Sequence, residues 1–334
     1  MKRPAVLFLL LSVLLHTILY LYRYHGTLLY QQEHYSQYAQ SLIQGDFSFI
    51  PPEDLRLFPG LPFLIALFSY VSGDTYSAGL AVSSLSLVAI YMLSYFISKS
   101  PFLAFTVTIF PPIVFEQTSK VSTETVTIAL IFTIIVLLNS TRVRLASFLS
   151  GFATIIRPVT ICLYVSILIG LLRKRKYLSA LISLIYFAFF PTMLIIFNTI
   201  FLHSPLIQIS KNNEVGRGTF GFFQLLNDLV RAAIWGQWRI FFSGLAYLIF
   251  AVLLSVIVFG LRSSFYPKTG KIIKSWFMLS LIFIFAIGPT PFLEESPRYL
   301  SILFPIIPVM LYKKFRINPL LMAGMVFIGL TAFI

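Results

Sequence analysis

Long apolar segments separated by short polar gaps run along the whole chain. The apolar segments reach about 20 residues, which is the length that an α-helix needs to cross a bilayer. Lysine and arginine gather in the gaps, above all at 99, 142–144, 173–176, 262–274 and 313–316. Backbone polar groups in lipid must be satisfied within the protein, and helices of this length do so. The pattern therefore predicts an all-α, polytopic transmembrane protein.

The basic gaps also predict which way each helix runs, because cytoplasmic loops carry an excess of lysine and arginine. Placing all of them inside requires that residues 59–72, a short apolar stretch, form a re-entrant or interfacial segment instead of a span. It also requires that residues 145–172, basic at both ends, go out and come back as two half-length helices broken at Arg157–Pro158.

The remaining spans complete a topology of about 11 crossings in one domain, residues 1–334. We expect them at residues 4–22, 76–98, 101–116, 123–139, 177–201, 240–261, 275–290, 298–312 and 317–334. The first reads as an anchor and not as a cleaved signal peptide, because no small-residue cleavage site follows it. Two long loops, 23–75 and 202–239, then lie outside, and so do all 11 acidic residues.

Composition narrows the function classes. A net charge of +14 could indicate nucleic acid, but its spread over short loops is explained by membrane orientation and by contact with anionic membrane lipids. We therefore expect no nucleic-acid partner. The single cysteine, Cys162, excludes a disulfide framework within the chain and a cysteine metal cluster. Phosphate-binding glycine loops, HExxH and GxSxG motifs are missing from the sequence, which argues against the common soluble enzyme classes.

The first outer loop contains an amphipathic, juxtamembrane helix. One face carries an apolar stripe at helical spacing, formed by Tyr35, Tyr38, Ala39, Leu42 and Ile43. Glu33 and several glutamines form the opposite face, and Gly45 ends the helix. We expect this helix to lie flat on the membrane surface. Glu33 stands at its N-terminus, where the helix dipole favours an ionised carboxylate.

Ionisable residues at the outer ends of the spans are candidates for a functional site, because charges at such depths are costly. Glu116 ends one predicted span and Glu124 begins the next. Arg157 and Arg298 stand at a helix break and at the start of a late span. Each has an ordinary interpretation as well, since acids are common at helix N-termini and arginine can reach from a helix end to the headgroups.

Several segments, taken in order, resemble those of the GT-C superfamily of membrane glycosyltransferases. Residues 34–45 (HYSQYAQSLIQG) are similar to the part of the first-loop pattern that follows the family's aspartate. The segments RLFPGLP, KVSTET, SGFATIIRP and SPRYLSILFPIIP resemble motifs of the second GPI mannosyltransferase and its prokaryotic relatives. The resemblance covers most of the chain.

The resemblance implies an inverting glycosyltransferase. It would transfer a sugar, mannose first among the candidates, from a polyprenyl- or dolichyl-phosphate-linked donor to a lipid, glycan or protein acceptor on the extracytoplasmic face. The protein would be a multi-pass component of the cell membrane in a prokaryote or of the endoplasmic reticulum membrane in a eukaryote.

The resemblance also implies roles for individual residues. Gln31 stands where the family has its catalytic aspartate, so Glu33 is the expected base, with Asp46, Asp54 and Glu124 as rivals. The donor phosphate would be held by Arg56, Arg157 and Arg298, supported by His34, Tyr35, Glu116, Glu124 and Tyr299. A divalent metal, which some members of the superfamily use, is a further option, although the sequence shows no ligand spacing for it.

Two alternatives remain open. An O-antigen-type polymerase or ligase would place its site in loop 202–239, which contains Arg217, Arg231 and Arg239. A lipid-linked saccharide transporter would carry charges along a central cavity, whereas the predicted span interiors here hold little beyond His16.

Overall fold

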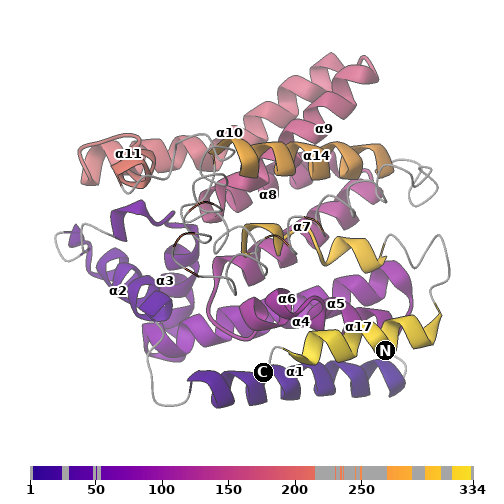
Figure 1. Ribbon diagram of the computed structural model, residues 1–334. Helices are drawn as coiled ribbons and strands as arrows, with labels where there is room; N and C mark the ends of the chain where they lie inside the picture. The colour runs from indigo at the N-terminus through magenta and orange to yellow at the C-terminus, as the bar shows by residue number, and fades with distance from the viewer. Residues whose placement is uncertain are drawn as a thin grey trace.

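A computed structural model describes residues 3–24, 30–47, 54–214, 269–287, 298–309 and 318–331, together with a few isolated positions. The described residues are helical, and no strand occurs among them. In Figure 1, α1 (Arg3–Tyr24) and α17 (Pro319–Leu330) lie along one edge of the molecule. The opposite edge is formed by α9 (Ile161–Arg173), α10 (Tyr177–Phe201) and α14 (Gly270–Ile287). The all-α prediction is confirmed for this part of the chain.

Three described helices are long and apolar enough to cross a membrane, namely α1, α4 (Thr75–Ser98) and α10. A fourth candidate is the pair α6 (Pro112–Thr118) and α7 (Thr123–Asn139), which bend by 103° at their junction. Several long apolar helices are what a membrane protein requires. The predicted total of about 11 crossings stays a prediction, and its span 240–261 lies outside the described residues.

The predicted break at Arg157–Pro158 is confirmed. Helix α8 (Val143–Ile156) ends directly before Arg157, a single 3₁₀ turn covers Pro158–Thr160, and α9 follows. Arg144 at the start of α8 and Lys176 just after α9 line one hollow. The two half-length helices therefore return to the side from which they started. Gly151 lets α8 pack closely on α10, since a Cβ at this position would collide with the carbonyl of Phe187.

Helix α3 (Gly60–Ser72) corresponds to the segment expected not to cross. Its 13 residues span about 20 Å, which is less than the roughly 30 Å of a bilayer core. It begins against the end of α8, where a Cβ on Gly60 would lie 2.7 Å from the carbonyl oxygen of Ile155. Gly73 ends it in the left-handed conformation, and Asp74 then caps α4 by accepting the Ser77 amide at 2.7 Å. Helix α3 is therefore too short to cross by itself, and its predicted re-entrant or interfacial placement stays a prediction.

The apolar stripe of the loop-one helix has a different partner from the one expected. Helix α2 (Tyr30–Gln44) forms as predicted, with Glu33 and Gln40 on its exposed face. Tyr35 and Ala39 are buried against Leu61 and other apolar side chains of α3 and α4. The expectation that this face meets the membrane is wrong, because α3 folds back beneath it and offers a protein surface instead. Figure 1 shows α2 and α3 grouped at one end of the molecule.

Two predicted spans are interrupted. Residues 101–116 do not form one helix: α5 (Pro101–Ile109) ends before Pro111, and α6 begins at Pro112. Proline lacks an amide donor and clashes with the preceding turn, so two in succession end a helix. Within 298–312, the described residues 298–309 form two short helical stretches joined by turns.

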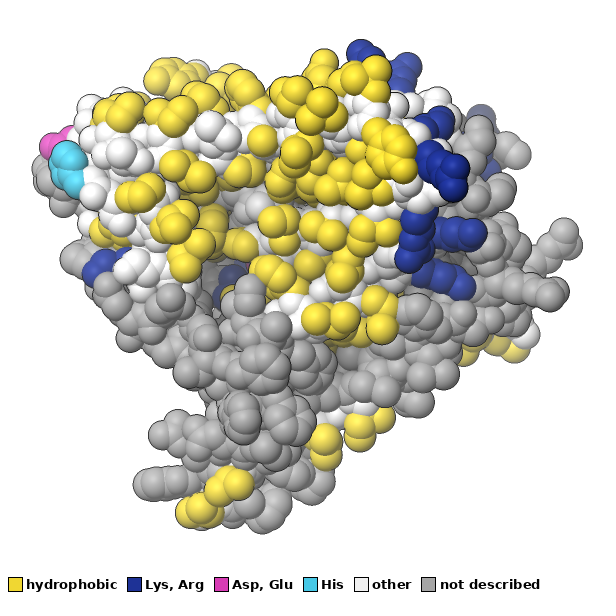
Figure 2. Space-filling model, turned by 90° about the horizontal axis from the view of Figure 1, so that it is seen from above, with side chains coloured by type: hydrophobic (Ala, Val, Ile, Leu, Met, Phe, Trp, Pro, Cys, Tyr) yellow, Lys and Arg dark blue, Asp and Glu magenta, His cyan; other side chains and the backbone are white. Residues whose placement is uncertain are grey.

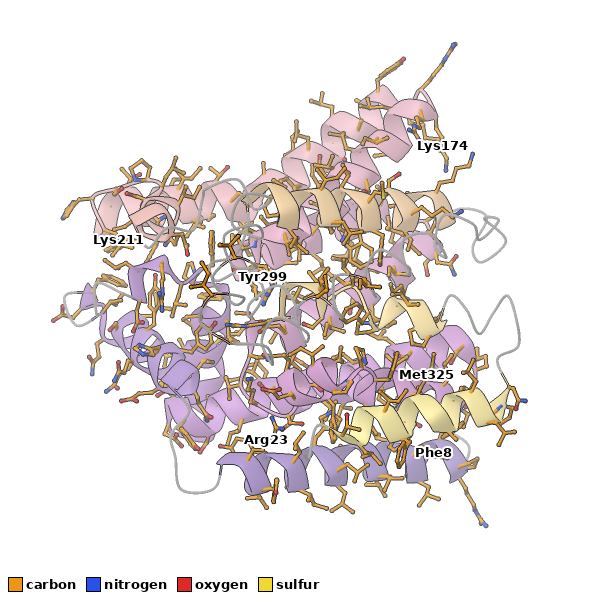
Figure 3. All side chains as sticks on the ribbon, viewed as in Figure 1. Phe8, Arg23, Lys174, Lys211, Tyr299 and Met325 are labelled. Atoms are coloured by element: carbon orange, nitrogen blue, oxygen red, sulfur yellow. The ribbon has the colours of Figure 1, made fainter. Side chains whose placement is uncertain are left out.

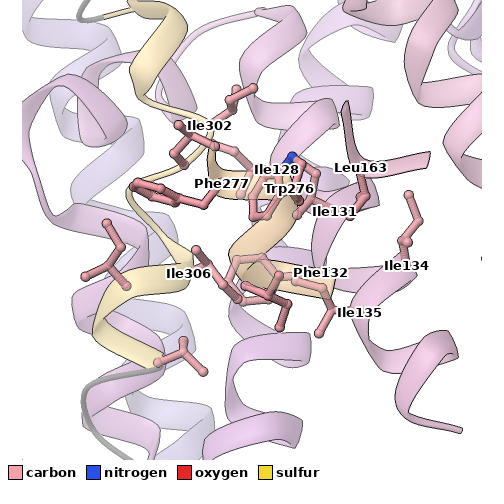
Figure 4. Packing of buried hydrophobic residues seen from close by; sticks show 14 of the residues in the cluster. Ile128, Ile131, Phe132, Ile134, Ile135, Leu163, Trp276, Phe277, Ile302 and Ile306 are labelled. Atoms are coloured by element: carbon pink, nitrogen blue, oxygen red, sulfur yellow. The ribbon is translucent and has the colours of Figure 1, made fainter. Parts of the chain in front are cut away.

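Helix α7 runs through the middle of the fold and is buried on nearly all sides. Figure 4 shows Ile128, Ile131 and Phe132 of α7 packed with Trp276 of α14 and Ile306 of the short helical stretch 306–309. Close packing of such large side chains holds helices together within a membrane, where lipid tails are as apolar as the core. The first turn of α7 is thereby held in a fixed place, and the candidate site is built on it.

Candidate functional site

The local sequence around residues 122–125 fixes the start of α7. Ser122 is the N-cap, and its hydroxyl accepts the amide of Thr125 at 3.3 Å. The hydroxyls of Ser122 and Thr125 also donate to the carbonyl of Gln117, at 2.8 and 2.9 Å. An N-cap serine of this kind is preferred because it satisfies one of the free amides of the first turn. Glu124 is thus placed in the first turn of α7, with a completely buried side chain.

Two arginines that are distant in the sequence bind this glutamate. Arg157 comes from the break after α8, and Arg298 opens the short helical stretch 298–300. Arg157 Nη1 and Arg298 Nε both contact Glu124 Oε1. Thr123 donates its hydroxyl to Glu124 Oε2 at 3.1 Å and accepts Arg157 Nη1 at 3.1 Å. Charge-assisted contacts such as these are roughly twice as strong as neutral hydrogen bonds.

Two tyrosines complete what we call the arginine cluster, which consists of Thr123, Glu124, Arg157, Arg298, Tyr299 and Tyr35. The guanidinium of Arg157 lies over the ring of Tyr299, 4.6 Å from its centroid. Figure 3 places Tyr299 in the centre of the fold. Tyr35 reaches the cluster from α2: burial raises the pKa of its hydroxyl, and the positive charges of Arg298 and Arg157 oppose that rise.

The cluster has an excess of positive charge. Two guanidinium groups and one carboxylate leave one net positive charge among its described residues. Arg157 is nearly buried, and its Nε has no hydrogen-bond acceptor in the part of the chain that the structure describes. The side chain of Arg298 is 20% exposed and forms the open edge of the cluster. A buried donor that meets no acceptor among the described residues, within a pair of guanidinium groups, favours an anionic ligand.

The other predicted site residues lie apart from the cluster. Glu33 is exposed on α2 and accepts Gln37 Nε2 at 3.3 Å. Its assignment as catalytic base stays a prediction. Glu116 is partly exposed and pairs with Arg23 at 3.6 Å and with Lys120 at 3.3 Å.

A second polar group lies beneath α2. His34 Nδ1 and the almost completely buried Asp54 are 2.5 Å apart. Asp54 begins the 3₁₀ turn Asp54–Arg56, and the carbonyl of Arg56 accepts Asn212 Nδ2 of α11 (Ile207–Glu214) at 3.1 Å. His34 and Asp54 are 20 positions apart in the sequence, so local motifs do not reveal this pair.

No group of three or more histidine, cysteine or acidic side chains among the described residues could hold a metal ion. Compared with known proteins, the chain matches no family model, no curated protein and no solved structure. The chemistry of the arginine cluster therefore carries the functional argument.

Proposed function

We propose that the protein is a GT-C-type membrane glycosyltransferase that transfers a sugar from a polyprenyl-phosphate-linked donor to an acceptor on the extracytoplasmic face. One observation carries the proposal. Arg157 and Arg298, the residues that the family resemblance would assign to the donor phosphate, meet at the buried carboxylate of Glu124. Arg157 binds Thr123 across 34 residues of sequence and Arg298 binds Glu124 across 174, and this convergence on neighbouring residues supports a shared role for the two arginines.

The charge of the cluster suits this reaction. A polyprenyl-linked phosphosugar is a phosphodiester with one negative charge. When the acceptor oxygen attacks the anomeric carbon, the bond from that carbon to the phosphate oxygen breaks, and the lipid leaves as a phosphate monoester with additional negative charge. Fixed positive charge next to this oxygen stabilises the transition state more than the ground state. Arg298, at the open edge, is the closest match to this role, with Arg157 behind it and Arg56 as a third proposed contact.

The acceptor hydroxyl must lose its proton to a base. Glu124 is an unfavourable candidate, because both arginines occupy its carboxylate. We keep Glu33 as the proposed base and Asp54 as its rival. Asp54 is supported by its position 2.5 Å from His34, since a carboxylate and an imidazole in contact can accept a proton together.

The finer features of the proposal follow the family resemblance. Mannose is the first candidate sugar, and the acceptor is a lipid, a glycan or a protein. The outer ends of about 11 crossings would carry the site, with α3 as a re-entrant or interfacial segment that supports α2.

The test is transfer in vitro from polyprenyl-phosphate-mannose and related donors, with the acceptor analysed by mass spectrometry. Arg298→Ala should lower donor use about 10- to 100-fold, because a hydrogen bond to a charged group contributes roughly 1.5–3 kcal/mol. Lysine should restore only part of this if the contact is bidentate. Arg23→Ala is the matched control, since Arg23 pairs with Glu116 outside the cluster. Equal activity of Arg298→Ala and Arg23→Ala would remove the cluster from the proposal, and failure with every polyprenyl donor would reject the function.

A lipid-linked saccharide transporter is the second candidate. The net positive cluster could hold the phosphate of such a cargo as well as that of a donor. Movement of a labelled lipid-linked saccharide across proteoliposomes, without transfer to any acceptor, would favour the transporter.

A further inference from the structure

A second anion-favouring feature lies at the opposite, basic end of the molecule. A hollow of about 430 Å³ opens where α8 and α10 begin and α9 ends. Its polar lining consists of Thr141, Arg142, Arg144, Lys176 and Ser179. Its apolar lining consists of Val143, Leu145, Leu171 and Ile182. Three cations and two hydroxyls thus surround one space, and no acidic side chain is among the described residues that line it.

The backbone strengthens this preference for negative charge. Helices α8 and α10 both begin at the hollow, and their N-cap residues, Arg142 and Lys176, provide no side-chain acceptor for the first-turn amides. The N-terminal amides of a helix and its dipole both attract anions. Serine, threonine, aspartate and asparagine are preferred at the N-cap because their side chains satisfy one of these amides. Here cations stand in that position twice, so an external anion can meet side-chain and backbone donors together.

The surroundings of the hollow indicate what kind of anion it suits. Figure 2 shows a group of Lys and Arg side chains at the margin of a broad hydrophobic face. Next to the hollow, Leu145, Leu172, Leu178 and Leu181 are exposed on α8, α9 and α10. A ligand with a charged head and apolar chains would satisfy both the cations and this adjoining apolar surface. A free inorganic anion would use only the polar half of the lining.

We propose that this hollow binds the phosphate headgroup of an anionic phospholipid in the cytoplasmic leaflet. The phosphate lies between Arg142, Arg144 and Lys176, and the acyl chains run along the exposed leucines. The side of the membrane follows from the positive-inside rule. This site is separate from the arginine cluster and does not depend on the proposed glycosyl transfer.

The test measures lipid binding by the purified full-length protein in native mass spectrometry. The probes are phosphatidylglycerol and phosphatidylcholine with the same acyl chains. The wild-type protein should retain phosphatidylglycerol in preference to phosphatidylcholine. The triple variant Arg142→Gln, Arg144→Gln, Lys176→Gln should lose this preference by about 10- to 100-fold, because each basic residue near an anionic surface contributes roughly 1 kcal/mol. All three positions are exposed, so the fold should tolerate them.

A matched control separates a site from diffuse charge. The control is a second triple variant, Arg173→Gln, Lys174→Gln, Arg175→Gln. It removes three neighbouring exposed cations that do not line the hollow. It should keep the preference for phosphatidylglycerol to within about 2-fold, since no charge in the hollow changes. Equal losses in the two triple variants would overturn the proposal.

A third variant keeps every charge and fills the space. Ser179→Phe should also abolish the preference for phosphatidylglycerol. Ser179 is exposed and lines the hollow, so the phenyl ring of the variant would occupy the space. Retention of phosphatidylglycerol by Ser179→Phe would overturn the proposal. Displacement of the lipid by millimolar inorganic phosphate, with phosphate bound in its place, would reject the lipid and leave a phosphate-ion site.

Discussion

The arginine cluster at the start of α7 and the basic hollow at the start of α8 both favour anions, but they are built in opposite ways. In the cluster the cations are mostly buried and are held by one carboxylate, Glu124. In the hollow the cations are exposed and no described carboxylate joins them. Burial explains the difference, because a charge removed from water must be paired, whereas an exposed one is stabilised by solvent.

This contrast has a functional consequence. A paired arginine has few accessible rotamers, so the cluster can present fixed donors to the phosphate of the proposed donor. Exposed arginine and lysine side chains adapt to a headgroup that varies in position, which suits lipid binding. Helix α8 connects the two regions, since Arg144 lies in its first turn and Arg157 directly follows its last residue. Its 14 residues separate the two regions by about 21 Å.

The two proposals place the arginine cluster and the hollow on opposite sides of the membrane. Thiol labelling tests this placement, and the expected difference in labelling is all or none. In a Cys162→Ala background, a single cysteine replaces either Ser72, at the end of α3, or Ser140, next to the hollow. Both positions are exposed. A membrane-impermeant thiol reagent added outside should label Ser72→Cys and spare Ser140→Cys until the cells are opened. If both cysteines are labelled from outside, the two regions do not face opposite sides of the membrane, and the proposed location of each site is wrong.

The next largest effect concerns the proposed proton acceptor, Glu33 or its rival Asp54. Removing a general base lowers turnover by about 10²–10⁴-fold. If Glu33 has this role, Glu33→Gln should show that loss while donor binding is kept, measured as kcat against KM. Asp54→Asn should then retain turnover, although the pair with His34 is weakened. The reverse result, with Glu33→Gln active and Asp54→Asn inactive, would assign the role of base to Asp54.

Pairing within the arginine cluster predicts a large loss of stability. Glu124→Gln would leave the two guanidinium groups without their counter-charge, and breaking a buried pair costs about 3–5 kcal/mol. Glu116→Gln is the matched control, because the same change at a partly exposed glutamate should cost at most about 1 kcal/mol. Thermal unfolding in detergent compares the two. If they unfold at the same temperature, the charge pairing does not stabilise the cluster.

Local chemistry explains which parts of this arrangement the sequence can predict. The break at Arg157–Pro158 and the helix 177–201 follow from proline and from apolar length, and both are confirmed. The interruption at Pro111 was predictable in principle, but the apolar run continues through it. The partner of the α2 stripe depends on α3 folding back, and periodicity shows only that the stripe is buried. The contact between Glu124 and Arg298 joins residues 174 positions apart, and only tertiary packing determines it.

The smallest predicted effect tests whether α8 links the two regions mechanically. Gly151→Ala adds a Cβ that would collide with the carbonyl of Phe187, so α8 must move away from α10. Overpacking of this kind costs about 1–3 kcal/mol. Gly324→Ala in α17 is the control, because nothing lies within 4 Å of its added Cβ and alanine is the better helix former by up to about 1 kcal/mol. The unfolding temperature should therefore fall for Gly151→Ala and rise slightly for Gly324→Ala.

Because α8 places Arg144 at one end and Arg157 at the other, Gly151→Ala should also weaken both phosphatidylglycerol binding and donor use. Loss of stability with both binding properties intact would show that each region is held by its own local contacts.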